Sequence, residues 1–467
     1  MKMRAPRHAA SLALAIGLAG CASYHPLALS ERGNLVPGLA QLDLTLPSDE
    51  AGKAPAKLDA AKPLTPQQVG LLAVVNDPDL AAQRGKLDVA KAELLAAKVL
   101  PNPSIGLGYD FLLSGPATTD AWTASISQDI RSIIQYGPHV DAANARYKQV
   151  GADALWDVWQ VAQKARLLAV DINADTREIA YREQELAVLT DELKGVRKAT
   201  AQGNLDLTAL APLLAAEAGA QRDLAASRVT LLKDWQELNA LLGLQPTARF
   251  AIAAPEPVKL PETIDPLIAS LPGRRADLVA LKLGYDAAEQ DVRAEILGQF
   301  PAFSLGFAAG SDTSGVLSAG PQVTFDLPIF DHNQAKIAST RATREQLHAE
   351  YQARLDEAEG TARGLLAQAR VAEANLERAR TATESAAKLS ESAQRAYRQG
   401  NLSQRDVSDF LTTALERQLD ALDYERSLQE NYLALNVELG IGLPQTIPAS
   451  PYHLSPQPAK PTQETRL

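Results

Sequence analysis

The only cysteine of the 467-residue chain, Cys21, directly follows Leu18-Ala19-Gly20. Small residues before a cysteine form the lipobox of bacterial lipoproteins, whose thiol is acylated. The stretch before it has a basic start and an apolar run too short to span a bilayer as a helix. We therefore expect a signal peptide over residues 1–20 and a lipidated, palmitate-bearing Cys21. Ala22 after the cysteine favours sorting to the outer membrane.

No other residues have the spacing of a catalytic, metal or cofactor site. An acylated Cys21 leaves no thiol for a disulfide or for nucleophilic catalysis. Gly106-x-Gly108 lacks the third glycine of a dinucleotide fingerprint, and the histidines are scattered. A net charge of −10 without a basic stripe argues against nucleic-acid binding. We expect no enzyme activity, no catalytic residues, no cofactor and no metal site.

The chain contains an internal duplication. Gln202-Gly-Asn-Leu205 recurs as Gln399-Gly-Asn-Leu402, 197 residues later (399 − 202), and Leu242-Gly243 recurs as Leu439-Gly440 at the same offset. The segment Ser-Ile-Gly-Leu from residue 104 has a counterpart, Ser-Leu-Gly-Phe, from residue 304. A nearly constant offset at several landmarks indicates two tandem units of about 200 residues.

Each unit has the pattern of a helix, a β-hairpin, a long helix, a turn and a last helix. The long helices are expected at about 139–201 and 333–398, without a proline in either. At 1.5 Å per residue they are about 95–100 Å long, and the two other helices of each unit match them if stacked end to end. A fibrous coiled coil is disfavoured because strict heptads are not sustained. The shorter helices are expected at about 78–99, 205–242, 277–298 and 403–439.

The repeated tetrapeptide is predicted to turn the chain at the far tip of each helical hairpin. Gly203 and Gly400 supply a positive φ that ends a helix, and Asn204 and Asn401 are expected to cap the next one. The expected tip residues are Gln202, Gly203, Asn204, Leu205, Gln399, Gly400, Asn401 and Leu402.

The hairpins, at about 103–130 and 302–327, alternate between apolar and small or polar residues. Strands of this kind suit a barrel with a lipid-facing outside and a wet lumen, although a half-buried soluble sheet shows the same alternation. Four strands are too few to close a membrane barrel, so two, three or four chains must share one. The expected lipid-facing residues are Ile105, Leu107, Tyr109, Phe111, Trp122, Ile126, Phe303, Leu305, Phe307, Val323 and Phe325.

In this order the segments resemble the TolC-like outer-membrane efflux protein family over nearly all of the mature chain. The resemblance is carried by Leu100-Pro-Asn-Pro103, Arg274-Arg-Ala-Asp-Leu278, Asp326-Leu-Pro-Ile-Phe-Asp331 and the turn Ala396-Tyr-x-x-Gly400. It implies a mainly α fold with a membrane β-barrel. It further implies a homotrimer with a 12-stranded barrel on a periplasmic α-helical tunnel, a periplasmic adaptor (membrane fusion) protein and an inner-membrane pump of the RND type.

The resemblance also assigns the periplasmic aperture. Acidic residues just after the second tip turn line it in the family, and the matching positions are Asp406 and Asp409, three apart on one helical face. Three copies would place six carboxylates in a ring; alternatively, Asp406 only caps its helix. Asp206 stands alone in the first unit, so the first tip is expected to be mainly a docking surface for the adaptor.

The cargo is less defined than the channel. Phe330-Asp-His-Asn-Gln334 resembles a segment of the heavy-metal (cobalt-zinc-cadmium) branch, which favours efflux of metal cations. Drug efflux and a type I secretion duct are alternatives within the family. Outside it, a periplasmic coiled-coil adaptor lipoprotein and a structural lipoprotein without a pore stay open.

The expected organisation follows from these segments. Residues 1–20 are the signal peptide, 21–65 a lipidated N-terminal strap, 66–246 the first repeat, 247–443 the second repeat and 444–467 a disordered tail. We expect a passive exit duct, lipid-anchored in the outer membrane of a Gram-negative bacterium and extending into the periplasm.

Overall fold

The computed structural model describes residues 24, 26–45, 57–116, 119–442 and 444. The predicted signal peptide, Cys21 and nearly all of the predicted tail lie outside the described residues. Met1–Leu35 and Val36–Leu467 form separate compact units, and all elements below belong to the second. Among the described residues, every helix is too short or too polar to cross a membrane.

The first repeat begins with α2 (Pro66–Asn76) and α3 (Pro78–Ala97), which meet at Asp77. The Asp77 carboxylate accepts hydrogen bonds from the first backbone N–H groups of α3, and Pro78 occupies the first turn, as the sequence predicts. The repeat continues with β1 (Ser104–Asp110), β2 (Ala121–Asp129), α4 (Ile130–Ala201), η2 (Leu207–Ala209) and α5 (Leu210–Leu242).

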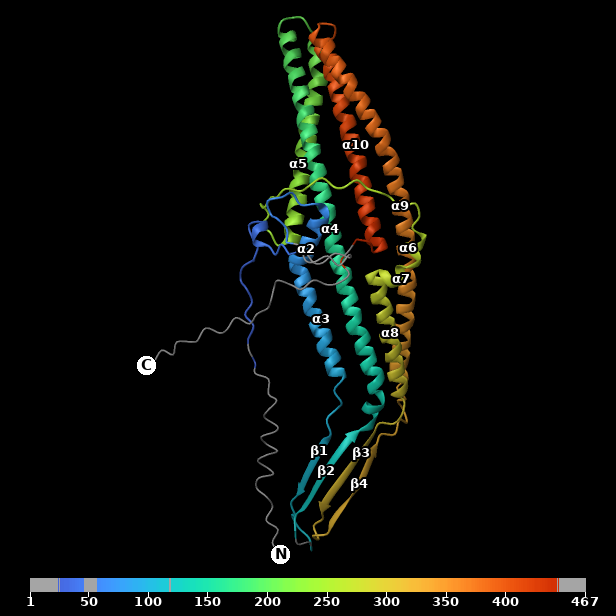
Figure 1. Ribbon diagram of the computed structural model, residues 1–467. Coiled ribbons are helices and arrows are strands. Elements are labelled where there is room, and N and C mark those ends of the chain that lie inside the picture. The colour runs from blue at the N-terminus through green and yellow to red at the C-terminus, as the bar shows by residue number, and fades with distance from the viewer. Residues whose placement is uncertain (1–23, 25, 46–56, 117–118, 443, 445–467) are drawn as a thin grey trace, which may run out of the picture. The chain divides into compact units, whose positions relative to one another are not determined.

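The second repeat has the same order after two short helices, α6 (Asp265–Ala269) and α7 (Leu271–Arg274). Its main elements are α8 (Ala276–Leu297), β3 (Phe303–Ser311), β4 (Leu317–Phe325), α9 (Gln334–Arg398) and α10 (Gln404–Leu439). The helices α3 and α5 both pack along α4, and α8 and α10 both pack along α9 (Figure 1). The prediction of two shorter helices stacked along each long one is therefore confirmed.

The helix α4 is longer than predicted because Pro138 does not end it. The sequence predicts a start near His139, since proline removes a backbone N–H and crowds the preceding turn. Instead α4 begins at Ile130, where the Asp129 carboxylate accepts hydrogen bonds from the first backbone N–H groups. Gln135 donates from Nε2 to a backbone carbonyl of α8 at 2.9 Å. Tertiary contacts thus hold the turns before Pro138 in a helix.

The four strands form one antiparallel sheet in the order β1-β2-β3-β4. Its register places Ile105, Ile126 and Phe307 side by side in one row across three strands. Directly paired residues share a face, so the predicted apolar residues do gather on one side of the sheet. Phe111 departs from the prediction, since β1 ends one residue before it. This face also carries the pairs Leu107–Ala124, Tyr109–Trp122, Leu305–Val323 and Phe303–Phe325.

The opposite face of the sheet carries small and polar side chains. Gly106 pairs with Ser125, and Gly306 pairs with Ser127. A Cβ atom on Gly306 would lie 2.5 Å from the carbonyl oxygen of Ile126. The close approach of β2 and β3 at this point therefore requires glycine.

The α4 helix connects the two repeats, since it contacts α2, α3 and α5 of the first and α8 and α10 of the second. One core cluster joins α2, α4 and α5 around Leu72, Leu238 and Leu242. The predicted N-terminal strap joins this cluster: the Val36 N–H donates to the Gly243 carbonyl at 3.0 Å. A second cluster joins α9, α10 and the start of α8 around Leu271, Leu278 and Leu435.

Candidate functional site at the two helical tips

Both tips turn on the same backbone motif. Gly203 has φ +77°, and Gly400 has φ +76°. The Gly203 N–H donates to the Thr200 carbonyl at 2.9 Å, and the Asn204 N–H donates to the Ala199 carbonyl at 2.9 Å. The second tip repeats both bonds at 2.8 and 2.9 Å. This Schellman pattern confirms the predicted role of the glycines as helix ends.

The predicted capping role of Asn204 and Asn401 is wrong. Their side-chain amides lie near the preceding glutamines at 3.4 Å. Asp206 caps η2 instead, by accepting from the Thr208 N–H at 2.8 Å, and Ser403 caps α10. The backbone N–H groups of Asn204 and Asn401 already bond within the Schellman turns. The side chain that caps the next helix therefore comes from a later residue, Asp206 or Ser403.

The two tips differ in surface chemistry. The first tip exposes Leu205 and Leu207, the latter by 72%. The second begins with a capping box, in which Ser403 and Asp406 each accept a hydrogen bond from the other's backbone N–H. Hydrogen bonds from Ser403 hold the pKa of the exposed Asp406 carboxyl below its ordinary value. A negative charge at this helix N-terminus is therefore stabilised.

Asp409 lies beside a buried acid of the first repeat. Glu192 on α4 is only 4% exposed, and burial raises the pKa of its carboxyl, with the neighbouring Asp409 raising it further. One residue earlier, Asp191 accepts a hydrogen bond from Gln404 Nε2 at 3.2 Å. The second tip thus brings acids of α4 and α10 together. Sequence reasoning missed Asp191 and Glu192, which lie in the turns of α4 before the first tip.

The segment from Phe330 to Gln334 turns the chain from β4 into α9. Asn333 has φ +64°, and its Nδ2 donates to the Glu295 carbonyl of α8 at 2.8 Å. Gln334 Oε1 accepts from the His332 N–H at 2.7 Å. Among the described residues, histidine, cysteine and acidic side chains do not gather in threes as a metal site would require. The contacts of this segment are those of a structural turn.

The comparisons with known proteins extend these observations. Residues 267–440, from α6 to the end of α10, match the family model described as "Outer membrane efflux protein". Over this part the chain is similar to that family. Comparison with curated protein sequences finds no match.

Solved structures share the fold of this chain over both repeats. A membrane protein from Pseudomonas aeruginosa is 18% identical with a TM-score of 0.68, covering 90% of this chain and 98% of its own. The CmeC outer membrane channel of Campylobacter jejuni is 15% identical with a TM-score of 0.68, covering 91% and 95%. CusC, whose structures concern transmembrane channel formation, is 18% identical with a TM-score of 0.66, covering 89% and 100%. The first repeat, outside the family match, therefore has the fold of these channels as well.

Proposed function

We propose that the protein is the passive exit duct of a tripartite efflux system, assembled as a homotrimer. Three chains share one 12-stranded barrel in the outer membrane, and their helices form a tunnel in the periplasm. An adaptor protein docks at the helical tips, and an inner-membrane pump of the RND type supplies the energy. Acylated Cys21 anchors each chain to the membrane.

The observation that carries the proposal is the open four-stranded sheet. β1 and β4 each pair on one side only, so each chain leaves two edges of backbone N–H and C=O groups. Lipid cannot satisfy such groups, and four strands are below the practical minimum for closure. The apolar face supports burial in lipid, because Ile105, Leu107 and Phe307 are between 52% and 81% exposed in the single chain.

Two measurements on the purified full-length protein test the duct. Mild extraction should give trimers that SDS dissociates, and planar bilayers should show discrete single-channel conductance. A monomer without conductance overturns the proposal. The adaptor alternative predicts no conductance but binding to a separate outer-membrane channel.

The aperture proposal places Asp406 and Asp409 at the narrow periplasmic end of the duct. Both are exposed on α10 near the second tip, where six carboxylates of a trimer would repel anions and bind cations. The double variant Asp406→Asn/Asp409→Asn removes the charge but leaves an acceptor for the Ser403 cap. It should raise conductance and lower cation selectivity.

The matched control is Asp420→Asn, because Asp420 is an exposed acid of the same helix that pairs with Arg417 at 2.7 Å, far from the tip. Equal conductance and selectivity in the double variant, the control and the natural protein would place the aperture elsewhere.

For the cargo we propose heavy-metal cations, on the resemblance of residues 330–334 to the heavy-metal branch. Deletion of the gene should lower the growth limit of the host for zinc, cobalt or cadmium salts by several-fold. A deletion strain that is sensitive to drugs or fails to secrete a protein, with unchanged metal tolerance, assigns the duct to one of the alternatives.

A further inference from the structure

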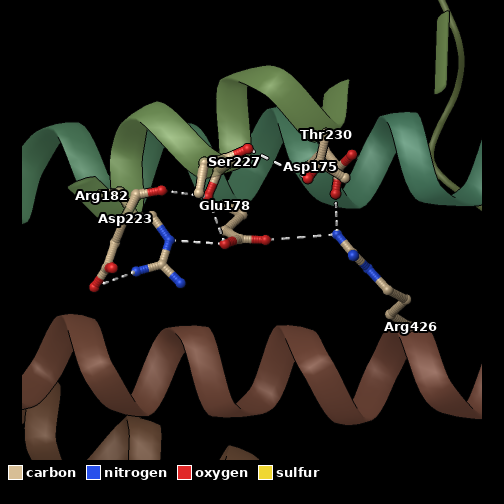
Figure 2. A network of polar contacts seen from close by, with 8 residues as sticks. Asp175, Glu178, Arg182, Asp223, Ser227, Thr230 and Arg426 are labelled. Atoms are coloured by element: carbon tan, nitrogen blue, oxygen red, sulfur yellow. Dashed lines mark hydrogen bonds and ion pairs between the residues drawn. The ribbon is translucent and has the colours of Figure 1, made fainter. Parts of the chain in front are cut away.

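Far from the tips, an arginine of the second repeat reaches into the first. Arg426 on α10 donates from Nη2 to Asp175 Oδ1 of α4, and the same nitrogen lies 3.7 Å from Glu178 Oε2 (Figure 2). Glu178 Oε1 accepts from Arg182 Nε at 2.7 Å and from Ser227 Oγ of α5 at 2.8 Å. Asp175 is 1% exposed. Three helices, α4, α5 and α10, therefore meet around one ion-paired cluster.

Carboxyl groups outnumber cationic groups at this meeting point, which we call the carboxyl joint. Its cations cannot neutralise all of its acids, so full ionisation would leave like charges packed together. Its acids are Asp171, Asp175 and Glu178 of α4, Asp223, Asp234 and Glu237 of α5, and Asp423, Glu425 and Glu430 of α10. Its cations are Lys164, Arg177 and Arg182 of α4, Lys233 of α5 and Arg426 of α10.

Two carboxyl oxygens of the joint are buried without a hydrogen-bond donor among the described residues: Asp171 Oδ1 and Asp175 Oδ2. An unsatisfied buried acceptor destabilises the folded state. Each of these acids has another carboxyl within hydrogen-bonding reach, Glu430 for Asp171 and Asp234 for Asp175. A carboxylate only accepts, so a hydrogen bond within either pair needs one proton. One proton on Asp171–Glu430 and one on Asp175–Asp234 would therefore give each pair a hydrogen bond.

The environment favours these protons near neutral pH. Burial raises the pKa of Asp171 to about 7, and the charge of Glu430 adds to the effect. Burial also raises the pKa of Asp234 to about 6, and its hydrogen bond with Asp175 adds to it. Arg426 acts in the opposite direction on both groups and keeps Asp175 paired.

We propose that the carboxyl joint is a proton-operated latch, which holds α10 against α4 and α5 while both carboxyl pairs share a proton and loosens it when the protons leave. The proton shared by Asp171 and Glu430 joins α4 to α10, and the one shared by Asp175 and Asp234 joins α4 to α5. An effect of the latch on transport rests on the proposed function. The link is α10 itself, which carries Asp406 and Asp409 at its other end.

The direction of the pH effect follows from proton linkage. The joined helices bind these protons more tightly than separated helices, whose acids have ordinary values near 3.8. The attachment is therefore complete below about pH 4, weakens as the pH rises through 6 and 7, and is weakest above that range.

Hydrogen exchange on the full-length protein tests the latch without requiring a pore. Backbone protection factors of residues 422–432, corrected for the intrinsic exchange rate, are measured at pH 5.5 and pH 8.5. The protection factors of the natural protein should fall at least about ten-fold between pH 5.5 and pH 8.5, which is the effect of one pKa unit. We expect only this minimum because solvent screens the charges of partly exposed groups. The variant Asp171→Asn/Asp234→Asn mimics the protonated pairs and should keep its protection at pH 8.5. Glu430→Gln gives a second test of the α4–α10 pair.

The matched control is Asp157→Asn. Asp157 also lies on α4, and burial raises the pKa of its carboxyl, but its neighbouring charge is Lys86 of α3 rather than a group of α10. This control should respond to pH like the natural protein. Unchanged protection in the natural protein, or an equal pH response in the double variant, overturns the latch. Failure of the duct would instead show as absent conductance with the pH-dependent protection intact.

Discussion

The assignment of the two faces of the sheet can be tested by one lysine placed on either face. Leu107 is the fourth of the seven residues of β1 and is 81% exposed in the single chain. It pairs with Ala124 on the apolar face. Thr123, the residue of β2 just before Ala124, lies on the opposite face and pairs with Gly108. The substitutions Leu107→Lys and Thr123→Lys therefore add the same charge at nearly the same height.

The expected costs differ widely. A lysine facing lipid near the bilayer midplane costs roughly 2–4 kcal/mol, so three copies cost a trimer about 6–12 kcal/mol. A lysine facing a water-filled lumen keeps its hydration and costs within about 0.5 kcal/mol, as most exposed substitutions do. Leu107→Lys should thus prevent most trimers from inserting, and Thr123→Lys should insert normally and change the conductance.

The assay is refolding into liposomes over a urea series, with the inserted trimer extracted in mild detergent and quantified on native gels. The midpoint for Leu107→Lys should fall far below that of the natural protein, whereas Thr123→Lys should match it. The reverse order would show that the apolar face lines the interior. Equal loss in both variants would mean that neither face meets water, as in a packed soluble core.

The remaining predictions concern the helices and the anchor. Arg275, 3% exposed, pairs with Asp277 at 2.8 Å and with Glu438, so Arg275→Met should cost roughly 3 kcal/mol in urea unfolding, because the half-buried Glu438 loses this partner and the buried Asp277 keeps Arg354 at 3.6 Å. The exposed Arg363→Met should leave the urea midpoint nearly unchanged. Gly203→Ala and Gly400→Ala should each cost about 1–2 kcal/mol because of their positive φ, and a stabilising effect would contradict the turn geometry. Gly360→Ala is their control, since Gly360 lies inside α9 with open space at its Cβ and alanine there should stabilise by up to about 1 kcal/mol. Cys21→Ala should abolish labelling with radioactive palmitate and release the protein from the lipid-anchored fraction, and persistent labelling would place the acyl chain elsewhere.

The sequence predicts those features that depend on local chemistry. The start of α3 at Asp77-Pro78 and the positive φ at Gly203 and Gly400 follow from a few neighbouring residues, and the structure has them in place. Strand alternation likewise predicts which residues share a face. Pro138 misled the prediction of α4, because the helix there is held by contacts with α8 rather than by its own sequence.

The carboxyl joint, and the position of Asp191 and Glu192 beside the second tip, were beyond sequence reasoning. Arg426 and Asp175 are separated by 251 residues, and no local pattern fixes how far α10 slides along α4. In the sequence, Arg426 and Asp175 look like charged residues on the solvent-exposed faces of two helices. The same uncertainty in register hid the effect of the Asp409 charge on the pKa of Glu192.

The position of α4 between the repeats has a consequence for biosynthesis. The ribosome completes this helix at residue 201, whereas its contacts with α10 extend toward residue 439. During that interval the surface around Asp175 lacks its later partner. An incomplete chain exposes surface that is buried in the folded protein. Association with another incomplete chain through this surface competes with correct folding. We therefore expect holding chaperones along the export route to reduce this misassembly.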